Sequence, residues 1–261
     1  MLPIILYENI LRNGTLTASG TDADYTLNNI LDYKSYSKWK ADNLTDPWIQ
    51  IELGVADDPD CIGIYNHNFN LVGGTIKLQY YDSGWIDLTT LTPNGTFPIL
   101  KNFTAQSSTK FRLFFDTPIV IPEAAVIFLG HLIEFPYPPT APTVPVAESI
   151  SAAMEISEAG HLLGAVISHF PIVINQRWEN ITRTWFDAYF RPFWFNHARY
   201  LIPFFYAWDL TNRSNDIFYV TVDPGQSFRE TLTVLSLTDA IELNMKGISS
   251  DQNYNPLTDE S

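Results

Sequence analysis

The sequence predicts a mainly β protein with two domains. Three observations indicate this: alternating apolar and polar runs in the first half, a proline-rich segment near the middle, and one aromatic helical segment among strand-like runs in the second half. The chain has 261 residues, of which 46% are hydrophobic and 17% charged, a composition that excludes intrinsic disorder. We therefore expect an N-terminal β-sandwich or jelly roll, followed by a small C-terminal β-sandwich or sheet with one α-helix.

Strands in the first half are predicted from period-two patterns. Apolar and polar residues alternate over 48–53, 75–80 and 110–115, and turn formers such as Gly54 bound these runs. Regularly spaced short strands without long helical periodicity favour a β-sandwich.

Five prolines between Phe135 and Glu148 divide the chain. Their spacing favours extended backbone and opposes both helix and sheet pairing. We interpret 137–148 as an interdomain linker between a first domain at 1–136 and a second at 149–248. Residues 249–261 are expected to form a flexible C-terminal tail.

One helix is predicted in the second half. Thr184 and Asp187 have the spacing of a capping box, and the aromatic residues of 185–195 occupy about half of a helical circumference. Pro192 predicts a kink or an early end. Strands are expected around this helix at 164–175, 201–208, 217–222 and 230–245.

Charge and cysteine content exclude several classes of protein. Fifteen Lys and Arg against twenty-nine Asp and Glu give a formal charge of −14, which opposes nucleic-acid binding. The single cysteine, Cys61, cannot form an internal disulfide, and the N-terminus lacks the pattern of a secretory signal, so we expect folding in a reducing cytosol. No apolar run approaches the roughly 20 residues of a membrane span, so we expect no membrane insertion.

Signatures of catalysis are absent from the sequence. The five histidines have no metal-ligand spacing, and there is no nucleophile elbow or phosphate-binding glycine loop. Cys61 is expected to be a small buried residue rather than a nucleophile. We therefore predict that the protein is not an enzyme, although a glycosidase acid pair among twenty-nine acidic residues stays open.

Several motifs in the first half agree in order and spacing with one known family. They are the sequences at 28–32, 37–41, 46–54, 62–68, 76–85 and 111–114. This series, within residues 5–135, resembles the discoidin, or coagulation-factor C-type, domains of the galactose-binding-like fold. The chain departs from secreted members in lacking their disulfide, and it has Tyr33 after Asp32 where many relatives have glycine.

The resemblance implies a sugar-binding site in loops at one end of the sandwich. Such sites combine an aromatic face with a few fixed polar groups. The candidate residues are Trp39, Asn66, His67, Asn68 and Trp85. The alternative is that the tryptophans are core residues and the asparagines only form turns.

The same resemblance implies a structural Ca²⁺, and no other cofactor is expected. Carry-over places the ion at Asp32, Ser37 and Glu134, although calcium takes six to eight oxygen ligands. The alternative is that Asp32 caps a turn and Glu134 is a solvated strand residue. The acidic cluster 57–60 is expected to be a solvated loop, because Pro59 interrupts a regular ladder of ligands.

Motifs in the second half resemble a different family. Gln176–Trp178, the aromatic helix 185–195, the run 197–209 and the strands that end at 245–248 are similar to the sheet-plus-helix domain of distal-tail and tail-tube-like proteins of long-tailed bacteriophages. This resemblance covers about 155–248. It implies a homo-oligomeric ring, a hexamer or a trimer, at the tail tip or baseplate, with other phage tail proteins as partners.

Aromatic density in the second half predicts an interface. Sixteen aromatic residues lie between Phe170 and Tyr219, more than we expect the interior of one small domain to hold. The candidate interface residues are Trp185, Tyr189, Arg191, Phe195 and Arg199. The alternative is that these aromatic residues only pack a core.

Our first functional hypothesis is a structural virion protein of a tail tip or baseplate, synthesised in the host bacterial cytoplasm. Its C-terminal domain would form the ring, and its N-terminal domain would contact neighbours or host surface glycan through many weak sites. The alternative is a lectin or accessory carbohydrate-binding module of a polysaccharide-degrading system. A third hypothesis is a glycan hydrolase.

Overall fold

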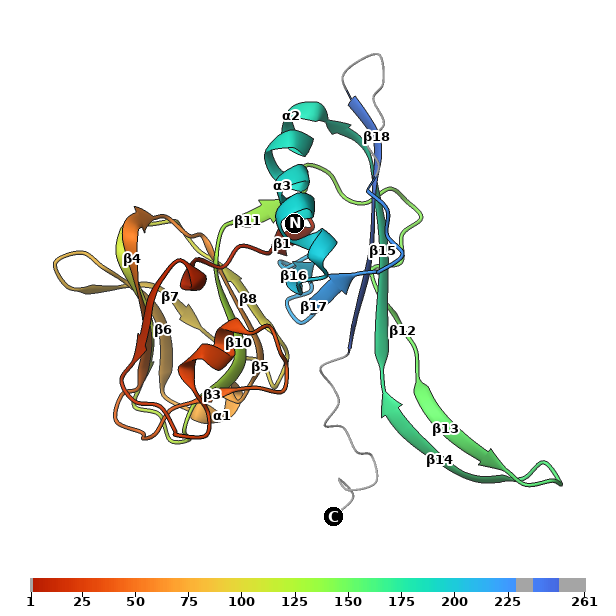
Figure 1. Ribbon diagram of the computed structural model, residues 1–261, viewed down its shortest axis with the longest axis horizontal. Coiled ribbons are helices and arrows are strands. Elements are labelled where there is room, and N and C mark those ends of the chain that lie inside the picture. The colour runs from red at the N-terminus through yellow and green to blue at the C-terminus, as the bar shows by residue number, and fades with distance from the viewer. Residues whose placement is uncertain (1, 229–236, 249–261) are drawn as a thin grey trace. The chain divides into compact units, whose positions relative to one another are not determined.

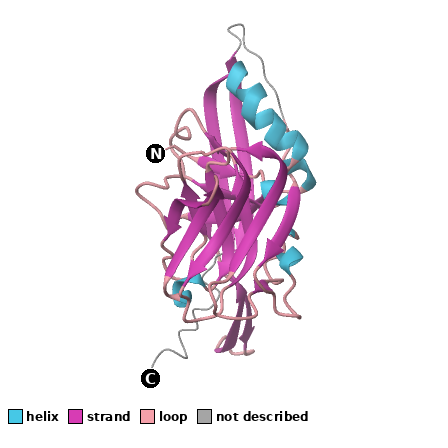
Figure 2. Cartoon of the chain, turned by 90° about the vertical axis from the view of Figure 1, so that its left-hand side faces the viewer, coloured by secondary structure: helices cyan, strands magenta, loops and turns pink. Residues whose placement is uncertain are grey.

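The structure, a computed structural model, describes residues 2–228 and 237–248 and is mainly β, as predicted (Figures 1 and 2). The chain divides into two compact units. The first comprises Met1–Phe135 and Phe204–Ile217, and the second comprises Pro136–Pro203 and the chain from Phe218 onward. No helix in the described ranges is long and apolar enough to span a membrane.

The first unit contains a β-sandwich of two antiparallel sheets. The five-stranded sheet has the order β2 (Gly14–Ala18), β4 (Trp48–Asp57), β9 (Ser108–Asp116), β6 (Thr75–Tyr81) and β7 (Trp85–Leu91). The four-stranded sheet has the order β3 (Trp39–Lys40), β10 (Glu123–Gly130), β5 (Cys61–His67) and β8 (Ile99–Asn102). Short helices join them: η1 (Ile10–Arg12), η2 (Leu27–Leu31) and α1 (Phe69–Val72).

The core of the sandwich explains the period-two patterns. Ile49 and Ile51 of β4 lie opposite Leu113 and Phe111 of β9, and these side chains face inward onto the four-stranded sheet. Because successive side chains of a strand point to opposite faces, alternating apolar and polar residues bury one face and leave the other in solvent. The alternating runs predicted at 48–53, 75–80 and 110–115 are confirmed as parts of β4, β6 and β9. Cys61 is buried, as expected.

Three further strands of the first unit pair in the order β11 (Leu132–Glu134), β1 (Ile4–Leu6) and β16 (Phe204–Ala207). Phe205 contacts Phe128 edge to face, with ring centroids 5.4 Å apart. A Cβ at Gly63 would lie 2.7 Å from the Phe205 ring, so the backbone of β5 approaches this side chain closely. Residues 204–217 therefore belong to the first unit, whereas the sequence placed them in the domain 149–248.

The second unit contains an antiparallel ladder in the order β17 (Ile217–Val222), β18 (Leu237–Ile248), β15 (Pro171–Thr182) and β12 (Ala147–Glu148). The register of β15 against β18 runs from Pro171 opposite Ile248 to Thr182 opposite Leu237. Alternate residues of β15, such as Ile174 and Trp178, are buried.

The predicted helix is present as one helical segment of α2 (Arg183–Trp185), a π-turn η3 (Phe186–Phe190) and α3 (Arg191–Asn196), with η4 (Ala198–Tyr200) after it. Thr182 rather than Thr184 is the N-cap, because its side chain accepts a hydrogen bond from the Trp185 N–H. Pro192 does not end the segment. It lies in the first turn of α3, next to the π-turn, where a missing backbone donor costs little.

The segment predicted as a linker lies along β15 within the second unit. The Thr140 N–H donates to the Arg177 carbonyl at 2.7 Å, and the Thr143 hydroxyl donates to Gln176 Oε1 at 2.8 Å. These contacts hold the proline-rich chain in an extended path without the regular donors that sheet pairing needs. The predicted tail at 249–261 lies outside the described residues.

A long hairpin continues from the β12–β15 pair. Its strands are β13 (Ser151–Ile156) and β14 (Leu162–His169), and they form a separate two-stranded sheet (Figure 1). We call residues 150–169 the β13–β14 ribbon.

Candidate functional site

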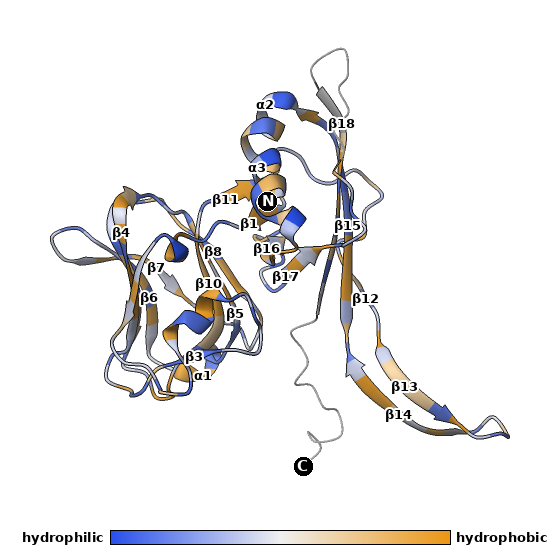
Figure 3. Ribbon diagram, viewed as in Figure 1, coloured by the Kyte–Doolittle hydropathy of each residue, from blue (hydrophilic) through white to orange (hydrophobic). Residues whose placement is uncertain are grey.

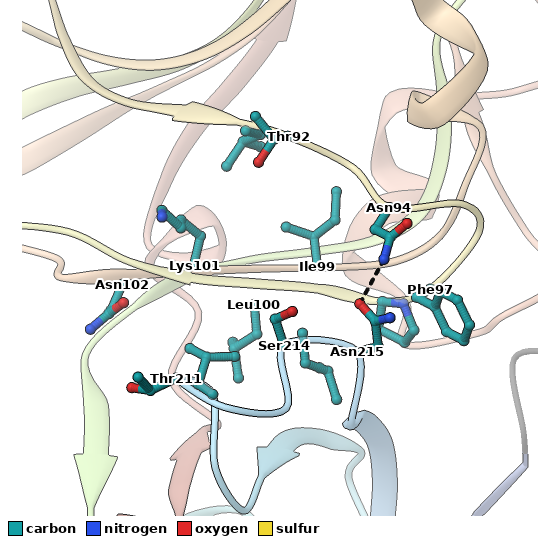
Figure 4. A pocket seen from close by; sticks show the side chains of 14 residues that line it. Thr92, Asn94, Phe97, Ile99, Leu100, Lys101, Asn102, Thr211, Ser214 and Asn215 are labelled. Atoms are coloured by element: carbon teal, nitrogen blue, oxygen red, sulfur yellow. Dashed lines mark hydrogen bonds between the residues drawn. The ribbon is translucent and has the colours of Figure 1, made fainter. Parts of the chain in front are cut away.

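A surface pocket of about 320 Å³ lies in the first unit beside β8, the edge strand of the four-stranded sheet. We call it the β8 pocket. One wall is the β7–β8 loop together with β8 itself, and the other is the loop that follows β16, residues 210–217. Figure 4 shows the side chains of both walls converging on the space between them.

Amide and hydroxyl groups dominate the polar lining of the β8 pocket. Asn94 Nδ2 donates to Asn215 Oδ1 at 2.9 Å, so a hydrogen bond joins the two walls (Figure 4). The other polar lining residues are Thr92, Lys101, Asn102, Thr211 and Ser214. Among these lining residues, all within the described part of the chain, there is no carboxylate, histidine or cysteine. The pocket can therefore form many neutral hydrogen bonds, but it holds neither an acid pair nor a nucleophile with its base.

His67 supports the loop that forms the pocket wall. The Phe69 N–H donates to His67 Nδ1 at 3.1 Å, which leaves Nε2 as the donor to the Phe97 carbonyl at 3.0 Å. Burial lowers the pKa of His67 to about 4, so the ring stays neutral near pH 7. His67 was predicted as a direct sugar ligand. Because its ring is buried and both nitrogens are engaged, it instead fixes the β7–β8 loop.

The two neighbouring asparagines also bind backbone. Asn68 Nδ2 donates to the Ile121 carbonyl at 2.8 Å, and its Oδ1 accepts from the Glu123 N–H at 2.9 Å. Asn66 Nδ2 donates to the Ser35 carbonyl at 2.6 Å, from a residue with φ of 50°. Both side chains organise loops, as the alternative interpretation of turn-forming asparagines held.

The two candidate tryptophans lie apart. Trp39 is 0% exposed, stacks on Phe115 and donates to the Thr21 hydroxyl, so the prediction that it binds sugar is wrong. Trp85 is half-buried, and the Arg112 guanidinium lies 4.2 Å from its ring centroid. It starts β7, whereas the pocket begins where β7 ends, a separation of about 20 Å along an extended strand. Trp85 therefore does not belong to the β8 pocket.

The calcium residues are brought together in part. Ser37 Oγ donates to Asp32 Oδ2 at 2.5 Å, and the Lys34 N–H donates to Asp32 Oδ1 at 2.8 Å. Glu134 is exposed on β11, opposite Ile4. The Lys34 ammonium approaches Asp32 at 3.7 Å, so this carboxylate already has the contacts of a capped turn. Asp32, Ser37 and Glu134 therefore fit a capped turn and a separate strand residue better than the six to eight oxygen ligands of a calcium ion.

The acidic cluster at 57–60 is tied to His131 rather than freely solvated. His131 Nδ1 lies 3.2 Å from Glu8 Oε2, and Nε2 lies 3.2 Å from Asp57 Oδ1 and 3.4 Å from Asp58 Oδ1. The hydrogen bond to Glu8 and the other carboxylates raise the pKa of His131 to about 9. Among the described residues, Asp57, Asp58 and His131 each have a possible metal-ligand atom, and these three atoms lie within 4.8 Å of one another. The protonated imidazole offsets part of the negative charge of this cluster.

The predicted interface residues lie on the outer side of the helical segment. Tyr189, Arg191 and Arg199 are exposed, and the Arg199 guanidinium lies 5.2 Å from the ring centroid of Phe195. Their role in assembly stays a prediction. Of the sixteen aromatic residues of 170–219, all of them described, eight are buried, six are partly buried, and Tyr189 and Tyr200 are exposed. Half of these rings are therefore covered within the chain, and the other half keep some exposed surface.

The β8 pocket residues were missed by the sequence interpretation. The runs Thr-Pro-Asn-Gly-Thr at 92–96 and Thr-Asn-Arg-Ser-Asn at 211–215 have the composition of polar loops, which was the available signal. Nothing in the sequence indicated that two loops more than one hundred residues apart would face each other, because the second was assigned to another domain.

Searches against protein-family models and curated proteins found no match. Several solved structures are similar to the N-terminal half. Chitosan-binding module 1 of a chitosanase/glucanase from Paenibacillus sp. IK-5 is 20% identical, with a TM-score of 0.41, over 47% of this chain and 98% of that chain. The family 32 carbohydrate-binding module of Clostridium perfringens NanJ, in complex with galactose, is 10% identical, with a TM-score of 0.40, over 51% of this chain and 100% of that one.

A lectin domain of lectinolysin, complexed with Lewis B antigen, is 17% identical over 48% of this chain and 96% of that chain, with a TM-score of 0.41. These similar structures are thus carbohydrate-binding modules and a lectin domain, and each matches about half of this chain.

Proposed function

We propose that the first unit binds carbohydrate through the β8 pocket, without catalysis. The observation that supports this is the convergence of amide and hydroxyl side chains from two loops onto one concave surface. An amide both donates and accepts hydrogen bonds, as a sugar hydroxyl also does, so a ring of amides and hydroxyls satisfies several sugar hydroxyls at once.

The size and charge of the pocket suit a short, neutral glycan. A volume of about 320 Å³ is at the lower end of the range for small-molecule pockets. Lys101 is the one charged residue among the described lining residues, so nothing in the lining attracts a polycation. We therefore expect a neutral glycan to bind better than a cationic one.

Glycan binding by the full chain tests this proposal. Galactose and chitosan oligosaccharides, named for similar structures, are suitable first probes in isothermal titration calorimetry. Galactose is neutral and chitosan is cationic, so galactose should bind more tightly. Asn94→Ala and Asn215→Ala each remove a lining amide, and loss of such hydrogen bonds should weaken binding about five- to tenfold. Asn43→Ala, an exposed amide in another loop of the same unit, is the matched control.

Two outcomes would contradict the proposal. One is the absence of binding to any neutral glycan on an array probed with the full chain. The other is binding that Asn94→Ala and Asn215→Ala leave unchanged. Release of sugar from a polysaccharide by the wild-type chain would contradict the non-catalytic role.

A second candidate function is that of a structural virion protein, a subunit of a phage tail-tip or baseplate ring with other tail proteins as partners. The β13–β14 ribbon favours it, because a projecting apolar hairpin is an assembly element rather than part of a ligand site. Electron micrographs of the purified full chain test this role. Closed rings are expected, and a monodisperse monomer at micromolar concentration would count against it.

A further inference from the structure

The β13–β14 ribbon exposes apolar side chains on both faces. Successive residues of a strand point to opposite faces, and the neighbours Val166 and Ile167 are 70% and 52% exposed. Figure 3 shows hydrophobic residues along both strands. The large apolar residues of the ribbon that are 52% to 70% exposed are Ile150, Met154, Ile156, Leu163, Val166 and Ile167. A hairpin with neither face covered is at best marginally stable in water, so the ribbon requires a partner.

The two edges of the ribbon differ in charge. Within the described ranges, β13 and β14 pair only with each other, which leaves an outer edge on each strand. β13 carries Glu155, whereas β14 reads Leu-Leu-Gly-Ala-Val-Ile-Ser-His and has no acidic residue, lysine, arginine or proline. Soluble proteins usually protect an edge strand with charge, proline or a bulge. The edge of β14 has no charge or proline. Its register against β13 is irregular at Leu163 and Ser168, and the regular run between them, 164–167, can accept another strand.

We propose that β14 pairs with β14 of a second copy of this chain. Antiparallel pairing of the two edges would make a four-stranded sheet with β13 at each outer side, related by a twofold axis. This contact rests on the assembly role given above as the second candidate function, in which it would join two copies while other contacts close the ring, and it is independent of glycan binding.

Charge favours a second copy at this edge. The chain has a net charge of −14, so two copies repel each other over most of their surface. From Ala159 to Trp178 the sequence has no Asp or Glu, and this run includes all of β14. Pairing at β14 keeps Glu155 and Glu158 away from the contact line. The segment 249–261 of the same chain is a poor alternative occupant, since its sequence carries three acidic residues and a proline and is otherwise mostly polar.

The apolar area on β14 itself is smaller than that of a standard interface. Its exposed apolar side chains Leu163, Val166 and Ile167, of roughly 60 to 120 Å² each and about 60% exposed, offer about 110 to 220 Å² per copy, or about 220 to 430 Å² for two. A standard interface of about 1,200 to 2,000 Å² contains about 700 to 1,100 Å² of apolar area. Main-chain hydrogen bonds between the two edges would therefore carry much of this contact, and the exposed faces of the ribbon leave room for contacts to further copies.

Sedimentation analysis of the full chain at about 10 μM, with three variants, tests the proposal. The wild type is expected to form a dimer or a larger assembly. Val166→Lys puts a charge into β14 and should weaken self-association at least tenfold. Met154→Lys, on β13 at a similarly exposed position, is the matched control and should retain association. Ala165→Cys, at the centre of β14, should give a disulfide-linked dimer on mild oxidation, since facing residues lie about 5 Å apart. Circular dichroism confirms that each variant is folded.

Every other outcome contradicts the β14 contact. A wild type that stays monomeric at 100 μM overturns it. Equal losses of self-association in Val166→Lys and Met154→Lys also overturn it, because they would indicate that the copies associate through a face of the ribbon and not through the edge of β14. A monomer that becomes a dimer only after deletion of 249–261 would show that the tail covers β14. Wild-type rings, together with an Ala165→Cys variant that gives no disulfide-linked dimer, would reject this contact but retain the structural role, so the two failures are distinguishable.

Discussion

The two units contain the same tripeptide, Ala-Val-Ile, in very different surroundings. In β10 it occupies 125–127, and all three side chains are at most 3% exposed. In β14 it occupies 165–167, where Val166 is 70% exposed. Both copies form strands, so β-branched residues determine the local structure in each case. What differs is the presence of neighbours: β10 is central in a sandwich, and β14 is half of an isolated hairpin. An apolar strand is therefore a core element or an interface according to what covers it.

The matched substitutions Val126→Lys and Val166→Lys should show the largest effect. Val126→Lys places an unpaired ammonium at a fully buried position of β10 and should cost about 4 kcal/mol or more of unfolding free energy, enough to unfold the first unit. Val166→Lys should change the stability of the monomer by about 0.5 kcal/mol or less. Urea unfolding followed by tryptophan fluorescence measures both. Similar losses of unfolding free energy in the two variants would contradict this difference between β10 and β14, because they would show that the ribbon is packed within the chain.

Acid should lower the unfolding free energy of the first unit through protonation of the buried His67. Its pKa is lowered to about 4 by burial, against about 6.5 in the unfolded chain, so the unfolded state binds the proton first. The stability associated with neutral His67 is complete above pH 6.5 and is lost as the pH falls through 4, a loss of about 3 kcal/mol. His67→Gln should remove this part of the pH dependence. Unfolding free energies of both proteins at pH 4 and pH 7 check it, and parallel curves would contradict the assignment.

Alkali should lower the unfolding free energy of the first unit by a smaller amount, through deprotonation of His131 at its surface. Its pKa is raised to about 9, chiefly by the hydrogen bond to Glu8. The stabilisation is therefore complete below pH 6.5 and is lost as the pH rises through 9. Because the ring is partly exposed, we expect about 1 kcal/mol rather than the full value of the shift. His131→Gln should flatten the unfolding free energy between pH 6.5 and 9. His161→Gln, at an exposed histidine of the ribbon, is the control for removal of a surface imidazole.

The candidate site was less predictable than the strands, for reasons that particular residues show. Asn66, His67 and Asn68 were selected because they lie where a strand ends. His67 does contact the pocket wall, at the Phe97 carbonyl, but the side chains of all three residues are engaged with backbone. Trp39 was selected for its ring, yet the ring fills the core. Polar and aromatic residues serve loops and cores with the same chemistry that they offer to a ligand, so residue type alone could not separate these roles.

By itself, the sequence determined the mainly β fold, the alternating strands β4, β6 and β9, and the aromatic helical segment after β15, because periodicity and capping act between residues that are near in the chain. Only the tertiary structure decided that 204–217 joins the first unit, that its loop faces the β7–β8 loop, and which half of the aromatic residues of 170–219 is buried. The tertiary structure also decided that the Ala-Val-Ile run is buried in β10 and exposed in β14. Burial depends on contacts between residues distant in the chain, and no local pattern specifies which distant residues will meet.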